Sequence, residues 1–158
     1  MKKTLVVYFS ASGVTGRVAA NVAKAAEADL FEIKPEVAYT KADLNWMDKQ
    51  SRSTIEMNDP ASRPAITGNV EAMSQYDTVI IGFPIWWYVA PTIINTFLEN
   101  NDFSGKKIAL FATSGGSGFG KTVEKLRPSV DASAEFISEK LLNRASEAEI
   151  VEWIESII

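Results

Sequence analysis

The fold is decided by one stretch near the start of the chain, Leu5-Val6-Val7-Tyr8-Phe9-Ser10-Ala11-Ser12-Gly13-Val14-Thr15. Its first five residues are continuously apolar, as expected of a strand that is buried on both faces of a parallel sheet. The apolar run leads into hydroxyl-bearing residues around one glycine, and a helical pattern begins at Val14. A strand, a short turn and a helix in this order predict an α/β fold.

The same alternation continues along the chain. Further strands are predicted over Asp29 to Lys34, Val79 to Phe83, Ile108 to Ala112 and, more weakly, Ala134 to Ile137. Helices are predicted over residues 14–28, near 44–57, from Pro91 to Asn100, and from the Ser146 capping box onward. Since the run over Asp29 to Lys34 alternates, we expect that strand nearer an edge. The pattern predicts a doubly wound five-stranded parallel sheet with helices on both faces, in a single domain over residues 1–158.

The composition limits the chemistry that the side chains can supply. The 158 residues include no cysteine and no histidine, which removes thiol nucleophiles, imidazole bases and the commonest zinc ligands. We therefore expect no metal site and no catalytic side chain, and assign the chemistry to a cofactor. The net charge of −4 disfavours nucleic acid. Gly82 and Pro84 interrupt the longest apolar stretch, so we expect no membrane span and a cytoplasmic protein.

The turn after the first strand has the features of a phosphate site. Ser10, Ser12 and Thr15 supply hydroxyl donors, and the backbone N–H groups of Ala11 to Thr15 lie at the positive end of a helix. The alternative is an ordinary helix cap, because hydroxyl-rich caps are common.

Two other strand ends complete a predicted pocket. Pro84-Ile85-Trp86-Trp87 follows the strand over Val79 to Phe83, and its aromatic rings can form a wall for a planar cofactor. Packing in the core is the alternative for these rings. The strand over Ile108 to Ala112 leads into Thr113-Ser114-Gly115-Gly116-Ser117, where glycines let the backbone approach a ligand closely.

These motifs together resemble the flavodoxin family in its short-chain branch, and the resemblance covers the whole chain in order. It implies a flavodoxin-like sheet with strand order 2-1-3-4-5 and a non-covalent flavin mononucleotide (FMN). It also implies that Ser10, Ala11, Ser12, Gly13, Val14 and Thr15 hold the FMN phosphate. Pro84 to Trp87, with Thr113 to Ser117, would border the isoalloxazine ring.

The chain departs from the family pattern at two places. Many flavodoxins have asparagine where this chain has Val14, which removes one side-chain donor but leaves the backbone N–H. Flavodoxins also have a glycine in the loop after the third strand of the sheet, where a peptide turns toward the half-reduced flavin. Residues 85–88 contain no glycine, and bulky residues resist such a turn.

A competing motif lies in the fourth loop. Gly115 to Thr122 satisfies the nucleotide-binding pattern G-x-x-x-x-G-K-[ST] between a strand and a helix. Against this interpretation, no later strand ends in an aspartate placed to hold magnesium, and Pro128 ends the following helix early. We therefore interpret Lys121 as a solvated charge on a helix.

Three functional classes follow from these predictions. The first is an electron carrier that passes electrons through FMN to redox partner proteins. The second is an oxidoreductase, an FMN-dependent NAD(P)H or quinone reductase that acts on a small substrate. The third is a binding module without redox activity. Because the sequence contains no signature for a nicotinamide site, the electron carrier is the leading hypothesis.

Overall fold

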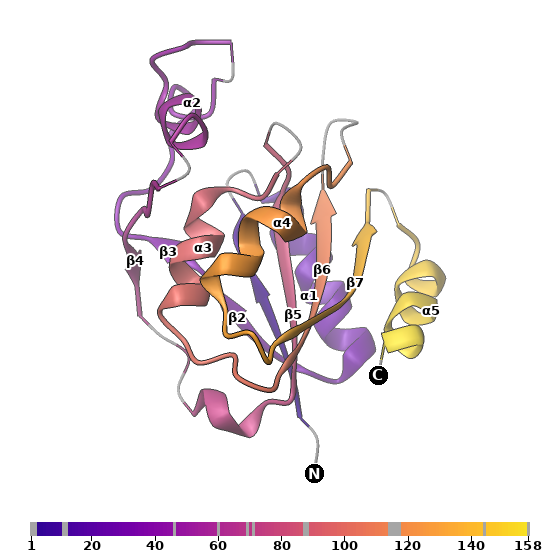
Figure 1. The fold of residues 1–158 in the computed structure, drawn as a ribbon. Helices are drawn as coiled ribbons and strands as arrows, with labels where there is room; N and C mark the ends of the chain where they lie inside the picture. The colour runs from indigo at the N-terminus through magenta and orange to yellow at the C-terminus, as the bar shows by residue number, and fades with distance from the viewer. Residues whose placement is uncertain are drawn as a thin grey trace.

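A computed structural model describes residues 3–10, 13–45, 47–59, 61–68, 70, 72–86, 89–113, 118–143 and 145–157. Its main sheet has five parallel strands in the order β2-β1-β5-β6-β7 (Figure 1). These strands are β1 (Thr4–Tyr8), β2 (Asp29–Glu32), β5 (Thr78–Pro84), β6 (Lys107–Thr113) and β7 (Glu135–Leu141). Counted within this sheet alone, the order is 2-1-3-4-5, which confirms the predicted fold class and the edge position of β2.

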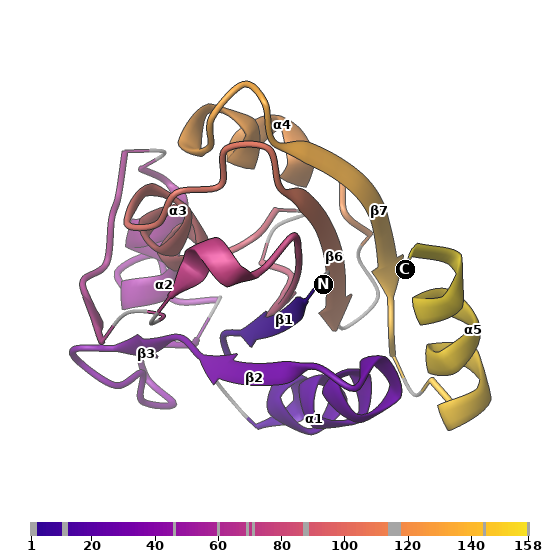
Figure 2. The same cartoon turned by 90° about the horizontal axis from the view of Figure 1, so that it is seen from below.

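Helices cover both faces of this sheet. Figure 2 shows α1 (Val14–Ala26) and α5 (Glu147–Ile157) on one side and α3 (Thr92–Glu99) and α4 (Thr122–Leu126) on the other. The predicted inward face of α3, with Ile93, Ile94, Phe97 and Leu98, is at most 1% exposed. The Ser146 cap is also present, because its Oγ accepts a hydrogen bond from the Glu149 N–H at 3.2 Å. The periodicity therefore identified the faces of these helices correctly.

The two sides of the sheet have separate apolar cores. Val6, Ile80 and Phe111 pack toward α1 and α5, whereas Val7 and Ile81 belong to the core under α3 and α4. This alternation follows from the period of two in a strand. All five side chains are fully buried, which accounts for the continuous apolar runs of the sequence.

Gly82 in β5 is required by the packing of its neighbour. A Cβ atom at this position would lie 2.0 Å from Cζ of Phe111, far inside any allowed contact. On the same side of the sheet, the Phe111 ring meets the Trp153 ring edge-on, with 6.3 Å between the centroids. Phe111 therefore fills the space that a side chain at residue 82 would need.

The predicted helix near residues 44–57 is wrong for most of its length, because α2 spans only Arg52–Met57. The segment before it consists of turns that are closed by side chains. Asp43 accepts from the Thr40 N–H at 3.0 Å, Asn45 from Met47 at 3.1 Å and Asp48 from Gln50 at 2.9 Å. Short polar side chains that bond the nearby backbone compete with helix formation, which explains the difference.

Several shorter elements were not predicted. Strands β3 (Lys34–Pro35) and β4 (Ile66–Thr67) form an antiparallel pair, and η1 (Met73–Gln75) and η2 (Arg127–Ser129) are single turns of 3-10 helix. The fifth strand of the main sheet, β7, is longer than predicted and has a register shift opposite Ile108 and Ala109. Runs of two or three residues are too short to show a period.

The pairing of β3 with β4 closes the base of a long excursion, residues 36–65, which contains α2. The N–H of Glu36 donates to the carbonyl of Ala65 at 2.9 Å at this base. Figure 1 shows α2 beyond the end of α3, on the side where the strands of the main sheet end. Within the described residues, no helix is both long and apolar enough to cross a membrane.

Candidate functional site

The carboxyl ends of β1, β5 and β6 lie side by side in the sheet (Figure 1). Tyr8 at the end of β1 is in register with Gly82, and Pro84 at the end of β5 is in register with Thr113. The chain passes from β1 to the edge strand β2 on one side of β1, and the later strands β5 and β6 are added on its other side. Such a change of direction leaves a crevice at the strand ends, where open α/β sheets bind their ligands.

The loop after β1 has the conformation of a tight turn into a helix. Ser10 Oγ accepts a hydrogen bond from the Gly13 N–H at 3.0 Å, and Gly13 has φ +90°, a value that glycine adopts readily. Helix α1 begins at the next residue, Val14, whose side chain is exposed. Ala11 and Ser12, which are also predicted to hold a phosphate, lie outside the described residues.

Thr15 joins this loop to the end of β6. Its side chain is 2% exposed, and its Oγ1 lies 2.8 Å from Oγ1 of Thr113, at hydrogen-bond distance. Two predicted site residues that are far apart in the sequence are therefore in contact. Because each hydroxyl has one donor and two acceptor positions, Thr15 can accept from Thr113 and still donate to a ligand.

The end of β5 positions the first of the two tryptophans. The Ile85 N–H donates to the Thr113 carbonyl at 2.9 Å, and the Ile85 side chain is buried in the core. Trp86 and Val89 exchange two backbone hydrogen bonds, at 3.0 and 3.1 Å. Pro84 and Trp86 are half-buried, whereas Trp87 lies outside the described residues.

Trp86 belongs to an aromatic cluster that the sequence did not predict. The Trp86 ring meets those of Phe9 and Tyr39 edge-on, with centroid distances of 6.0 and 5.6 Å, and Phe9 and Tyr39 are also 5.6 Å apart. Phe9 follows β1, while Tyr39 belongs to the excursion. The predicted strand included Phe9, but no local pattern around Tyr39 indicates this contact.

Two charged residues of α2 hold Tyr39 in the cluster. Cζ of Arg52 lies 3.8 Å from the centroid of the Tyr39 ring, a cation–π contact. The same guanidinium pairs with Glu56 at 3.0 Å, and Glu56 accepts a hydrogen bond from the Tyr39 hydroxyl. Burial raises the pKa of Tyr39, and the hydrogen bond to Glu56 raises it further. The phenol is therefore neutral at physiological pH.

The loop after β6 is described only at its ends. Thr113 is buried, whereas Ser114, Gly115, Gly116 and Ser117 lie outside the described residues. Lys121 is exposed, and α4 ends after five residues and continues into η2, which contains Pro128. The exposure of Lys121 agrees with its interpretation as a solvated charge, and the early end of α4 agrees with the predicted effect of Pro128. No group of three or more metal-ligating side chains occurs among the described residues.

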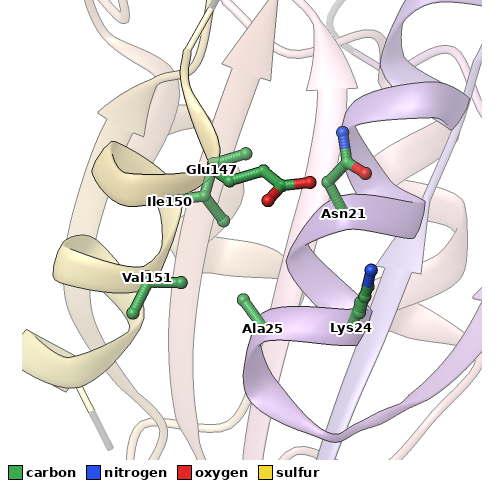
Figure 3. Close-up of a pocket in the computed structure, with 6 residues that line it drawn as sticks. All are labelled: Asn21, Lys24, Ala25, Glu147, Ile150 and Val151. Atoms are coloured by element: carbon green, nitrogen blue, oxygen red, sulfur yellow. The ribbon is translucent and has the colours of Figure 1, made fainter.

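A small cavity of about 170 Å³ lies between α1 and α5 (Figure 3). Glu147 extends toward Asn21 across it, and Ile150 lies on its α5 side. None of the predicted site residues that the structure describes lines this cavity. It is therefore separate from the strand-end crevice.

Comparisons with known proteins agree with this geometry. The family model described as Flavodoxin matches residues 3–157. A Bacteroides eggerthii protein of solved structure is 46% identical over 99% of this chain and 98% of its own, with a TM-score of 0.90. A Lactobacillus acidophilus flavoprotein, solved in complex with FMN, is 24% identical over 97% and 99% of the two chains, with a TM-score of 0.69. Flavodoxin 2 from Bacillus cereus shares the fold at 19% identity and a TM-score of 0.57, over 98% and 96%. No curated protein matches the chain.

Proposed function

The chain belongs to the flavodoxin family, and from this premise we propose that it binds FMN without a covalent bond and carries electrons to redox partner proteins in the cytoplasm. The contact that carries the proposal is the one between Thr15 and Thr113. It brings a hydroxyl from the first turn of α1 and a hydroxyl from the end of β6 together at the switch point of the sheet, where the sequence predicts the flavin. The FMN complex of the Lactobacillus acidophilus flavoprotein supports the same cofactor.

The donors at the start of α1 fit a phosphate group. Ser10 and Thr15 carry hydroxyls, Gly13 gives the loop its tight turn, and the first N–H groups of α1 lack partners within the helix. These neutral donors favour a phosphate at the end of a flavin chain over the longer diphosphate of a dinucleotide. Bound there, FMN would supply the redox chemistry that a chain without cysteine or histidine lacks.

Trp86 would form part of the wall for the ring system. Its edge-on contacts with Phe9 and Tyr39 restrict the ring, so the wall is preorganised before a flavin arrives. Arg52 and Glu56 hold Tyr39 in turn. The excursion would therefore contribute to flavin binding through Trp86.

A second candidate function is an FMN-dependent NAD(P)H or quinone oxidoreductase. The observation that favours it is the pair of backbone hydrogen bonds between Trp86 and Val89, which fixes both ends of a loop without glycine. Loop ends held in this way would oppose the peptide rotation that supports one-electron chemistry in flavodoxins, and would so favour two-electron transfer.

Titration of the apoprotein with FMN and riboflavin tests the cofactor assignment. Replacing Thr15 by valine removes a hydroxyl donor, so we expect FMN binding to weaken by ~1 to 3 kcal/mol, as for a hydrogen bond to a charged group. Riboflavin lacks the phosphate, and its affinity is expected to change little. The Thr15→Ser variant keeps the hydroxyl and serves as the control. Equal weakening of both flavins would show that the loop does not bind the phosphate.

Two measurements on the FMN-loaded protein separate the candidate functions. An electron carrier is reduced by a flavodoxin reductase, passes electrons to cytochrome c and oxidises NAD(P)H only slowly by itself. Rapid NAD(P)H oxidation without a reductase would favour the oxidoreductase. Stepwise photoreduction followed by absorbance gives an independent answer, since two resolved one-electron steps support the carrier. Apoprotein that takes up no flavin would instead identify a binding module.

A further inference from the structure

A second and larger cavity of about 410 Å³ lies between α3 and α4. Val89 and Ala90 of the loop after β5 line one side of it, and Met57 and Arg63 of the excursion line another. Helix α3 follows the loop that contains Trp86, and α4 follows the loop after β6. The cavity is therefore next to the loop after β5, one of the two loops predicted to border the isoalloxazine, and part of its wall comes from the helix that follows the other loop. Its volume is at the lower end of the range for small-molecule sites.

Thr92, in the first turn of α3, lines this cavity and has a hydroxyl without a partner. The residue is 8% exposed, and Oγ1 makes no hydrogen bond with any part of the chain that the structure describes. An unpaired buried hydroxyl destabilises the folded state, and native structures contain few of them. Oγ1 is sealed from solvent, but rotation about χ1 exchanges it with the methyl group. A ligand in the cavity could therefore supply the missing partner only after this rotation.

Asn95 is one turn further along α3 and offers an acceptor. Its Nδ2 donates to the carbonyl oxygen of Lys125 at 3.1 Å and to Ser129 Oγ at 2.9 Å. Since a carbonyl oxygen can only accept, these bonds fix which end of the amide is Nδ2. Oδ1 must point the other way, and no donor to it is found among the described residues. Unlike Thr92 Oγ1, it is not sealed from solvent.

Ser129 and Glu99 confirm the direction of these bonds. The Ser129 hydroxyl donates to Glu99 Oε2 at 2.8 Å, so its oxygen is free to accept from Asn95. The hydrogen bond from Arg63 lowers the pKa of Glu99, and the bond from Ser129 lowers it further. Glu99 is therefore an ionised acceptor, and Asn95 cannot reverse its amide without losing two bonds.

The charges around the cavity nearly cancel. Arg63 forms an ion pair with Glu99 at 2.9 Å, and the adjacent residues Glu124 and Lys125 both line the cavity. This balance favours an uncharged ligand over a phosphate or a carboxylate. The ligand must also bring a donor for Asn95 Oδ1 and an acceptor for the Thr92 hydroxyl, which lie on the same face of α3.

We propose that this cavity binds the nicotinamide ring of a nicotinamide nucleotide through its carboxamide. The amide N–H would donate to Asn95 Oδ1, and the amide oxygen would accept from the rotated Thr92 hydroxyl. A quinone offers only acceptors and would place an oxygen against Asn95 Oδ1, so it fits less well. The inference rests on the second candidate function, the FMN-dependent oxidoreductase, and names its substrate class.

Titration of the ¹⁵N-labelled, FMN-saturated protein with free nicotinamide tests this binding by NMR. We expect saturable shifts of backbone amides in α3, α4 and residues 89–90. The analogue 3-acetylpyridine keeps the ring and the carbonyl but has no N–H donor, so we expect about fivefold weaker binding, as for the loss of one hydrogen bond. Equal affinity for the two ligands, or no saturable shift near the cavity, would overturn the proposal.

The Thr92→Val variant gives a second test with two readouts of opposite sign. Losing the hydroxyl should weaken nicotinamide about fivefold and raise the midpoint of thermal unfolding by about 2 to 4 °C, because an unpaired buried group is removed. Thr92→Ser should restore the binding. A lower midpoint, or unchanged nicotinamide affinity, would contradict the assignment.

Ser53 provides a matched control for these readouts. Its buried Oγ also has no partner among the described residues, but Ser53 does not line the cavity. The Ser53→Ala variant should therefore gain thermal stability and keep its affinity for nicotinamide. If FMN saturates the protein and nicotinamide does not bind, only this inference fails. If FMN itself does not bind, the proposed function fails.

Discussion

The five-stranded sheet and the excursion of residues 36–65 are held together by different interactions. In the sheet, Val7, Ile81 and Phe97 are fully buried, and apolar contact is the main source of stability. In the excursion, Tyr39 is held by the Arg52 guanidinium and by Glu56, while the large apolar residues Val37, Met47 and Ile55 are exposed. A region with few buried apolar contacts opens more readily than a core. The excursion should therefore open without unfolding the sheet.

The largest effect is expected from filling the space next to Phe111. The Gly82→Ala variant places a Cβ where the Phe111 ring lies, at 2.0 Å from Cζ. We expect a loss of about 3 kcal/mol in the free energy of global unfolding, since overpacking a dense core forces strained side chains. Chemical denaturation measures this loss. Replacing the Phe111 ring by the smaller leucine side chain, in the double variant Gly82→Ala/Phe111→Leu, should recover part of the stability. No recovery would show that the ring is not the obstacle.

A smaller and local effect is expected in the excursion. The Tyr39→Ala variant removes the ring that lies between Arg52 and Trp86. We expect amide exchange in α2 to lose about 2 kcal/mol of protection, while the free energy of global unfolding changes by less than about 1 kcal/mol. Hydrogen exchange measured by mass spectrometry separates the two quantities. Equal losses in α2 and β1 would show that the excursion and the sheet unfold as one unit.

The structure explains why these two regions differed in how well the sequence predicted them. Continuous apolar runs and helix faces such as Ile93, Ile94 and Phe97 result from burial, and burial leaves a period in the sequence. The turns at Asp43 and Asn45 result from single side-chain hydrogen bonds, which leave no period. The contact of Tyr39 with Trp86 joins distant segments, so no local pattern could predict it.

The candidate site shows the same division between features that the sequence pattern predicted and contacts that it did not. The hydroxyl loop, the end of β5 and the end of β6 followed from the strand pattern, since parallel strands end at one edge of the sheet. The direct contact between Thr15 and Thr113 did not follow, because it depends on the register of β1 with β5 and of β5 with β6. Thr92 and Asn95 were also missed. In the sequence they resemble the ordinary polar residues of an amphipathic helix.

The smallest expected effect concerns a single polar contact within the sheet region. The Tyr76 hydroxyl donates to Asp29 Oδ2 at 2.7 Å and so ties the start of β5 to β2. Burial and this hydrogen bond raise the pKa of Tyr76 to about 12. Because the folded pKa exceeds the unfolded value of about 10, the stabilisation is complete below pH 10 and is lost as the pH rises toward 12.

The Tyr76→Phe variant isolates this contribution. At neutral pH we expect it to unfold about 1 kcal/mol more easily than the wild type. Above pH 10 the difference should shrink, because only the wild type loses stability by ionising in the unfolded state. Urea denaturation at several pH values measures the difference. A gap that widens above pH 10 would reverse the assigned direction of the pKa.

The position of β1 between β2 and β5 has a consequence for the growing chain on the ribosome. β2 follows β1 closely in the sequence, whereas β5 begins only at Thr78. A nascent chain that has not yet reached β5 therefore has one edge of β1 without its partner, and unpaired edges invite aggregation. Val6 can pack against α1 soon after synthesis, but burial of Val7 must wait for α3. The main sheet can therefore close only late in synthesis, after β5 has emerged from the ribosome.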